Sequence, residues 1–249
     1  MSTTTNDDLG LSASTTSITT PSFGSFTFGA GTGGHSGKYD EEVPQAYEQI
    51  SDANGSEMAN AVGNFLDQNF VGYTSPTLDL MGATVTAHVE YSPMASDETG
   101  AAGDGSQATY NATVGAAKSL GLTIGYEGLK LGFYGAERER TVPKVAGATG
   151  NYQHDEFNGV WYAKYSMGPV SIGYSESYID AGVTSAISTT SSTTAKSVRS
   201  GGGIYTGDQM SIAFNVNDNM SISYTTSDET YDTQDDAKTA VTTDDDVTE

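Results

Sequence analysis

Apolar and polar side chains alternate along much of this chain. In residues 209–224 small or polar residues separate a series of apolar ones, namely Met210, Ile212, Phe214, Val216, Met220, Ile222 and Tyr224. Successive side chains of a β-strand point to opposite faces, so the pattern predicts strands with one apolar and one polar face. Between them, Asn217, Asp218 and Asn219 predict a tight hairpin turn, because Asn and Asp tolerate left-handed backbone.

The same alternation predicts strands in further segments, which are residues 25–29, 83–91, 119–128, 129–135, 157–165 and 169–177. In the last but one, Phe157, Trp161 and Tyr165 share one face, and Tyr162 and Lys164 share the other. The polar face is dominated by Gly, Ser, Thr and Asn throughout, which is typical of a wall that lines water.

Short and long connections alternate between these segments. The short ones are 78–82, 127–128, 167–168 and 217–219, and the long ones are 31–68, 93–106, 137–155, 179–200 and from 228 onward. Short turns at one end and long loops at the other are typical of transmembrane barrels. The expected fold class is therefore all-β, an antiparallel up-and-down transmembrane β-barrel.

A soluble antiparallel sandwich is the competing interpretation, because its strands also alternate. A sandwich buries its apolar face against a second sheet and does not require a regular exchange of short turns and long loops. The small, polar residues of the other face suit a wet lumen. Both features favour lipid on the apolar face and water on the polar one.

Composition limits the partners of the chain. Its 249 residues carry a formal net charge of −22 with only ten Lys and Arg, and there is no cysteine. Nucleic acid is excluded as a partner, because a phosphate-binding face requires a basic footprint. No apolar run approaches the roughly 20 residues of a membrane-spanning helix. The first ten residues, MSTTTNDDLG, lack the basic and apolar regions of a signal peptide.

Two stretches resemble the general porins of Gram-negative outer membranes. The first is PSFGSFTFGAG, residues 21–31, and the second is FVGYTSPTLDLMGATVTAHVEY, residues 70–91. The second resembles a porin hairpin that follows the inward-folded loop. The positions that carry its match are Tyr73, Ser75, Pro76, Gly82, Val85 and Tyr91.

The resemblance implies a place for each segment in a porin. Residues 23–29 would be the fifth strand, 9–18 the fourth and 220–226 about the thirteenth, with 31–68 as the inward-folded constriction loop. The chain, 1–249, would then be a single partial barrel domain, with about ten strands of a sixteen-strand barrel. It would be a fragment of an outer-membrane protein that lacks its signal peptide, and a homotrimer in outer-membrane lipid when complete.

One segment leaves two interpretations open. Residues 107–118 alternate like a strand, but a separate strand there would break the even pairing between the long loops. The segment either extends the strand of residues 120–127 or belongs to the preceding loop. We favour the extension.

Candidate site residues lie in the long loop and on the polar face. The resemblance implies that the loop narrows the pore with four acids, Asp40, Glu41, Glu42 and Glu48. Alternation places His88, Glu90, Lys130 and Lys164 on the polar face, where they would line the lumen wall. The competing interpretation is a solvated acidic loop. Helical spacing of Met58, Val62 and Phe65 predicts a short helix within it.

Enzyme and cofactor motifs lack their structural context. The G-x-G-x-x-G match at residues 29–34 opens no amphipathic helix, so dinucleotide binding is not expected. His35, His88 and His154 are isolated along the chain, which predicts neither a catalytic nor a zinc triad. We expect no enzyme activity, no cofactor and no bound metal.

The expected function is a water-filled channel for passive diffusion of ions and small hydrophilic solutes, with a mild preference for cations. Two alternatives remain at this stage. One is a structural or adhesive β-protein of the cell surface, and the other is a soluble β-sandwich binding module.

Overall fold

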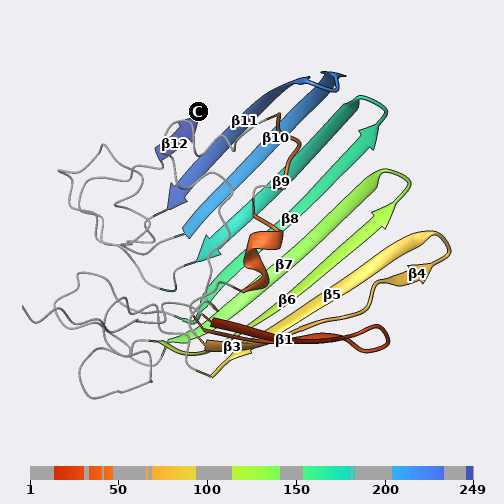
Figure 1. Ribbon diagram of the computed structural model, residues 1–249. Helices are drawn as coiled ribbons and strands as arrows, with labels where there is room; N and C mark the ends of the chain where they lie inside the picture. Colours follow the sequence, from red (N-terminus) through yellow and green to blue (C-terminus); the bar gives the residue numbers. More distant parts are fainter. Residues whose placement is uncertain are drawn as a thin grey trace, which may run out of the picture.

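The structure, a computed structural model, describes residues 14–30, 34–40, 42–46, 66, 69–93, 114–140, 154–180, 182, 204–232 and 245–248. Nearly all of these residues belong to one antiparallel sheet whose strands lie side by side in chain order (Figure 1). The predicted all-β, up-and-down antiparallel fold is confirmed. Within the described residues the sheet is open, and β1 and β12 form its two edges.

The strands β1 to β12 and one helical turn account for the described elements. Their bounds are β1 Ser14–Thr20, β2 Gly24–Ala30, η1 His35–Lys38, β3 Asn69–Thr74, β4 Leu78–Leu80, β5 Ala83–Ser92, β6 Val114–Tyr126, β7 Leu129–Arg140, β8 Glu156–Met167, β9 Val170–Asp180, β10 Ile204–Asn217, β11 Met220–Asp232 and β12 Asp245–Thr248. Among the described residues no helix is long and apolar enough to cross a membrane.

The short turns at one end of the sheet follow from local backbone conformation. Glu127 and Gly128 both have positive φ angles, 43° and 87°, as the tightest hairpin turns require. A Cβ atom at Gly128 would lie 2.5 Å from the carbonyl oxygen of Ser166, so the position admits only glycine. The tight hairpin turn predicted at residues 217–219 is confirmed, although none of these three residues has a positive φ angle. Instead, Asn217 Oδ1 accepts a hydrogen bond of 2.9 Å from the backbone N–H of Asn219.

Several strands extend further than the alternation predicts. The long connections were expected to begin at residues 137, 179 and 228, but β7, β9 and β11 continue to Arg140, Asp180 and Asp232. Backbone pairing explains the difference, because a ladder needs no apolar side chains. The predicted short connection 78–82 likewise contains β4, which pairs with β5.

Two other predicted strands are confirmed over part of their predicted ranges. β6 begins at Val114, so residues 114–118 do extend the following strand, while 107–113 lie outside the described residues. The strand expected at 9–18 is β1, Ser14–Thr20, and residues 9–13 are outside the described part. β12 was not predicted. The helix expected around Met58, Val62 and Phe65 also lies outside the described residues.

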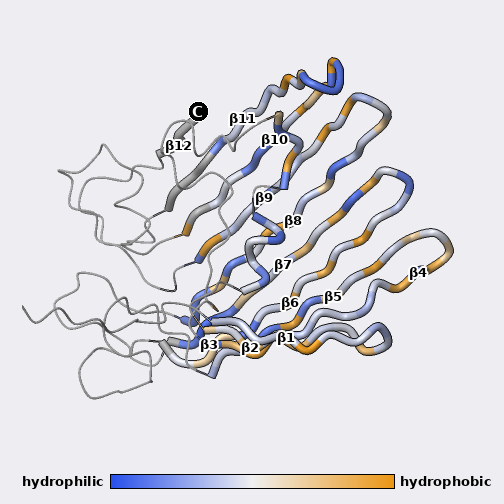
Figure 2. Tube along the Cα trace, in the orientation of Figure 1, coloured by the Kyte–Doolittle hydropathy of each residue, from blue (hydrophilic) through white to orange (hydrophobic). Residues whose placement is uncertain are grey.

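In a soluble protein the apolar face of a sheet is buried and the polar face is exposed. In this sheet the apolar face is exposed and the polar face is buried. On β10, Met210 is 58% exposed and Ile212 48%, whereas Gln209 is 0% and Ser211 3% exposed. The tube coloured by hydropathy shows the same alternation along the strands (Figure 2). Exposed positions are mainly apolar, and buried polar residues lie on the other face. The polar face is therefore the inner one.

The buried core also lies on the polar face. Its members are Tyr39, Leu66, Phe70, Ala117, Tyr134, Ala136, Val160 and Tyr162. Strands β1–β3 are seen edge-on in Figure 1 while β5–β11 are seen face-on, so the sheet is curved. Residues that follow β2 in the chain lie on its concave side and cover part of this face.

Candidate functional site

A stretch of chain crosses the concave, polar face of the sheet. We call residues 34–40 and 42–46 the crossing segment; η1 is its first turn. It begins beside β5, where His35 bonds to Glu90, and it ends beside β11, where Ala46 bonds to Ser223 (Figure 1). The crossing segment thus belongs to the long connection 31–68, which the sequence predicts to fold inward.

The first attachment joins the backbone of the crossing segment to a carboxylate. The N–H of His35 donates to Glu90 Oε1 at 2.7 Å, and the hydroxyl of Ser119 donates to Glu90 Oε2 at 2.8 Å. A Cβ atom at Gly34 would lie 2.8 Å from the same carboxylate, so glycine is what lets the chain approach. Glu90 therefore fixes one end of the segment.

Two histidines meet at this attachment. The ring centroids of His35 and His88 are 4.7 Å apart, and Thr74 Oγ1 lies 3.3 Å from His35 Nε2 and 3.1 Å from His88 Nδ1. Burial lowers the pKa of His35 to about 3, and the positive charges of Lys38 and His88 lower it further. The prediction that the histidines are isolated is wrong for this pair, because pairing of β3 with β5 and folding of the segment bring them together. Among the described residues, no group of three side chains can hold a metal ion.

Two tyrosines fill the space in front of two inward-facing glycines, Tyr39 at Gly121 and Tyr162 at Gly132. Tyr39 comes from the crossing segment. It is fully buried, stacks on Tyr134 at a ring-centroid distance of 5.2 Å and lies 6.3 Å from Tyr162. A Cβ atom at Gly121 would lie 2.4 Å from Tyr39 Oη, and one at Gly132 would overlap the ring of Tyr162. Burial raises the pKa of Tyr39 to about 12, so its hydroxyl stays neutral. Sequence reasoning missed Tyr39, although glycines on a polar face between larger residues indicate close approach of another group.

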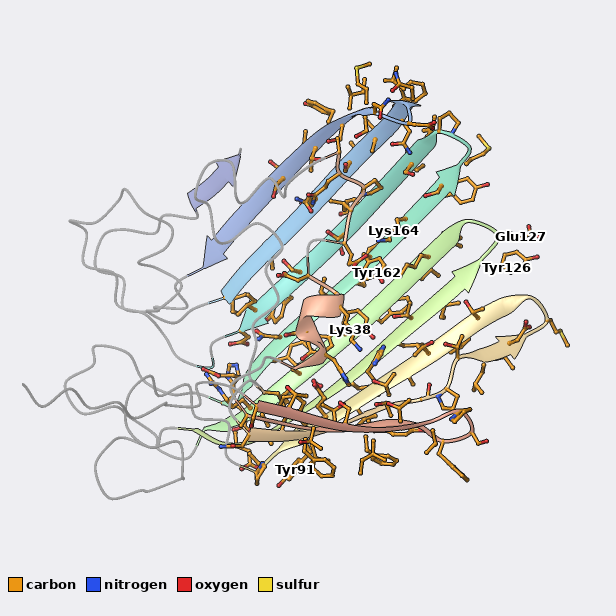
Figure 3. All side chains as sticks on the ribbon, in the orientation of Figure 1. Lys38, Tyr91, Tyr126, Glu127, Tyr162 and Lys164 are labelled. Atoms are coloured by element: carbon orange, nitrogen blue, oxygen red, sulfur yellow. The ribbon has the colours of Figure 1, made fainter. Side chains whose placement is uncertain are left out.

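The predicted acid and bases meet at the centre of the crossing segment. Both Lys130 and Lys164 donate to Glu42 Oε2, the former at 3.5 Å. Their ammonium groups also lie over the ring of Tyr162, at 5.5 and 5.6 Å from its centroid. Figure 3 shows Lys38, Tyr162 and Lys164 together on this side of the sheet. One carboxylate therefore faces two ammonium groups that belong to neighbouring strands, β7 and β8.

Wall hydroxyls hold the end of the crossing segment by its backbone. Ser211 donates to the carbonyl oxygen of Pro44, and the N–H of Ala46 donates to Ser223 Oγ at 3.0 Å. Gly173 leaves room for Pro44, since a Cβ atom there would lie 2.4 Å from Pro44 Cδ. The segment is thus attached at β5, at β7 and β8, and at β10 and β11.

The remaining predicted site residues have different positions. Asp40 is in the crossing segment and half-buried, whereas Glu41 and Glu48 lie outside the described residues. His88 and Glu90 do point to the polar face, but both are buried at the first attachment. Of the predicted wall residues only Lys130 and Lys164 are partly exposed.

Comparison with known proteins gives no family for this chain. No family model matches it, and no curated protein sequence matches it. The contacts of the crossing segment and the two faces of the sheet are therefore the observations from which a function can be proposed.

Proposed function

We propose that the chain forms part of the wall of a water-filled channel in an outer membrane, through which ions and small hydrophilic solutes diffuse passively. The observation that carries this proposal is the inverted burial of the sheet: its apolar side chains face outward, and its polar side chains and core lie on the concave face. Lipid is the environment in which an outward apolar face is stable. No catalytic step is part of the mechanism.

The outward apolar band supports a membrane position through its size. On β8 the outward positions from Phe157 to Met167 include Trp161, Ala163 and Tyr165 and no charged residue. At about 3.4 Å per residue this stretch is about 34 Å long. A strand tilt of about 40° reduces its height to about 26 Å, close to the roughly 25 Å of an outer-membrane barrel.

The alternative of a soluble sandwich has less support. A sandwich needs a second sheet against the apolar face, and within the described residues every strand belongs to a single sheet. The surface-adhesive alternative rests on the long connections, most of which lie outside the described residues. Neither alternative explains why a chain segment is attached along the polar face.

The crossing segment would narrow the channel and set its electric field. Glu42 and Asp40 would favour cations, while Lys38, Lys130 and Lys164 would favour anions. The chain's net charge of −22 adds a weak field that salt screens within roughly 8–10 Å. The two acids do not outweigh the three lysines, so the mild cation preference that we propose rests on the net negative charge of the chain, with Glu42 offsetting Lys130 and Lys164.

The two open edges of the sheet require further strands. β1 and β12 have one unpaired side each within the described residues. A membrane barrel must satisfy all backbone hydrogen bonds, so strands beyond the described ones would close the wall. In this proposal the chain is a fragment of a larger porin-like barrel, and the complete protein assembles as a homotrimer.

Conductance of the natural full-length protein tests the proposal. The purified, folded protein should give discrete current steps in planar lipid bilayers, and its folding should depend on detergent or lipid. A folded, detergent-solubilised preparation that inserts into bilayers without conducting would remove the channel function. Cross-linking in mild detergent that yields only monomer would remove the trimer.

A further inference from the structure

A groove of about 720 Å³ lies along the outward face of strands β6–β11. Its lining changes in character from one end to the other. At the β6–β8 end it is apolar, and at the β9–β11 end it is acidic. The inverted burial of the sheet places this groove where the proposed function expects lipid, so the inference below rests on that function.

The apolar end has a smooth floor between larger side chains. Gly135 and Gly159 are cross-strand partners, and Leu120 and Phe133 stand beside them. The ring of Phe157 lies beside both glycines, since a Cβ atom would be 3.0 Å from it at Gly159 and 3.7 Å from it at Gly135. The apolar side chains that line this end, Leu120, Leu122 and Phe133, offer a flexible hydrocarbon chain an apolar surface.

The acidic end combines three carboxylates in one cross-strand row. Asp208 is directly opposite both Glu176 and Asp228. Like charges in this arrangement repel, and no described basic side chain pairs with any of the three. The nearest outward lysine, Lys118, is paired with Glu137 on β6–β7. The row therefore complements a cationic group supplied from outside the protein.

Aromatic side chains stand where the two ends of the groove meet. Trp161 Nε1 donates to Glu176 Oε2 at 2.7 Å, and the hydroxyl of Tyr174 donates to Glu176 Oε1 at 2.6 Å. These two bonds turn the carboxylate oxygens of Glu176 towards the aromatic side chains.

The groove is inclined to the membrane if the strands are tilted. It runs across the strands, and strands at about 4.8 Å spacing put β7 and β11 about 19 Å apart. With the strand tilt of a barrel, this direction rises from the apolar end towards the end with the acids. The outward side chains are consistent with this direction. From the short turns upward, they remain apolar as far as Leu120 on β6, whereas on β11 they are no longer apolar at Asp228.

We propose that this groove binds a phospholipid whose headgroup carries a primary ammonium group. One acyl chain lies against Leu120, Leu122 and Phe133, and the ammonium group lies among Glu176, Asp208 and Asp228. A primary ammonium donates hydrogen bonds to carboxylates, which a choline headgroup does not do. An anionic glycerol headgroup is repelled.

Trp161 reports on this site, because it is the single tryptophan of the chain and lines the groove. The natural full-length protein, in which any tryptophan outside this chain is replaced by Phe, is reconstituted in vesicles that contain a small, equal fraction of lipid with brominated acyl chains. The brominated lipid has an ethanolamine, a choline or a glycerol headgroup. We expect the ethanolamine lipid to quench Trp161 fluorescence at least threefold more effectively than the other two.

Two variants and a control locate the effect. Joint replacement Glu176→Gln, Asp208→Asn and Asp228→Asn should make the three lipids equivalent. Gly135→Leu should reduce quenching by the ethanolamine lipid, because its side chain fills the floor while its Cβ atom makes an ordinary 3.7 Å contact with Phe157. Asp180→Asn, which changes an outward acid that bonds to His154 instead, should leave the preference unchanged.

The outcomes separate this inference from the channel function. Equal quenching by the three lipids overturns the headgroup preference and leaves the proposed channel intact. Absence of quenching by all three overturns both the inference and the lipid-facing position of the apolar face. A clear ethanolamine preference in a protein that fails to conduct supports the lipid site and removes the channel.

Discussion

Replacement of Gly121 by Ala should release the crossing segment from the sheet. The new Cβ atom would lie 2.4 Å from Tyr39 Oη and 2.7 Å from Tyr39 Cζ, well inside contact distance. Tyr39 has no space to retreat within the wall, because it is fully buried and stacked on Tyr134. The tyrosine must therefore move away from the sheet, and the segment must move with it.

The size of the effect follows from the cost of overpacking. An extra methyl group in a well-packed site costs about 1–3 kcal/mol. If the attached and released states of the segment are in equilibrium, this cost shifts their ratio about 5- to 150-fold towards release. Tyr39→Ala should also favour release, because the lost contacts of the ring would destabilise the attached state by about 3–5 kcal/mol.

Limited trypsin cleavage after Lys38 measures the release. Lys38 is exposed, but the next residue, Tyr39, is held in its buried site, so the intact segment resists the protease. Gly121→Ala should speed this cleavage and raise the single-channel conductance of the full-length protein. Gly37→Ala is the matched control, because a Cβ atom there meets nothing within 4 Å. Equal cleavage rates in both variants and the parent would refute the packing argument.

Three more predictions concern the charge, the acid response and the turns. Glu42→Gln leaves Lys130 and Lys164 without their shared carboxylate, so the reversal potential in a salt gradient should move towards anion selectivity. Lys164→Gln should move the reversal potential towards cation selectivity. An unchanged reversal potential in both variants would contradict the pairing. His35 is attached in its neutral form, with a pKa lowered from 6.5 to about 3, so attachment is complete above pH 6.5 and weakens as the pH falls towards 3. The free energy of attachment should change by up to about 1.4 kcal/mol per pH unit in this range. Hydrogen exchange of the backbone amides of the crossing segment, corrected for the intrinsic pH dependence of exchange, measures it, and protection that stays constant from pH 7 to pH 4 would count against it. Gly128→Ala should lower the free energy of unfolding by about 1–3 kcal/mol in a denaturant titration, because its φ is 87° and the Cβ would meet Ser166; Gly37→Ala should leave it unchanged.

Local periodicity was sufficient to predict the faces of the sheet. The alternation of Met210, Ile212 and Phe214 with Ser211 and Ala213 is set by strand geometry, and the exposed fractions follow it. Strand ends were less predictable. Residues such as Arg138 and Glu156 pair in the ladder although nothing in their local pattern favours a strand.

The contacts of the crossing segment could not be predicted from the alternation of apolar and polar residues. The sequence predicted Lys130, Lys164 and Glu42 to lie near the lumen. It did not predict that both lysines pair with the same carboxylate, because this depends on the register that puts Lys130 of β7 opposite Lys164 of β8. The approach of His35 to His88 and of Tyr39 to Gly121 joins residues far apart in sequence. Pairing of this kind is decided by the whole sheet, and alternation along one strand does not contain it.

Attachment through backbone atoms leaves the composition of the crossing segment open to change. Ser211 and Ser223 bond to the carbonyl oxygen of residue 44 and the amide N–H of residue 46; every residue supplies the first, and every residue except proline supplies the second. Mutations can therefore change the side chains at this end of the segment while its backbone keeps the same path across the sheet. Protein engineers could exploit the same independence, and graft new recognition groups at residues 45 and 46 on an unaltered scaffold.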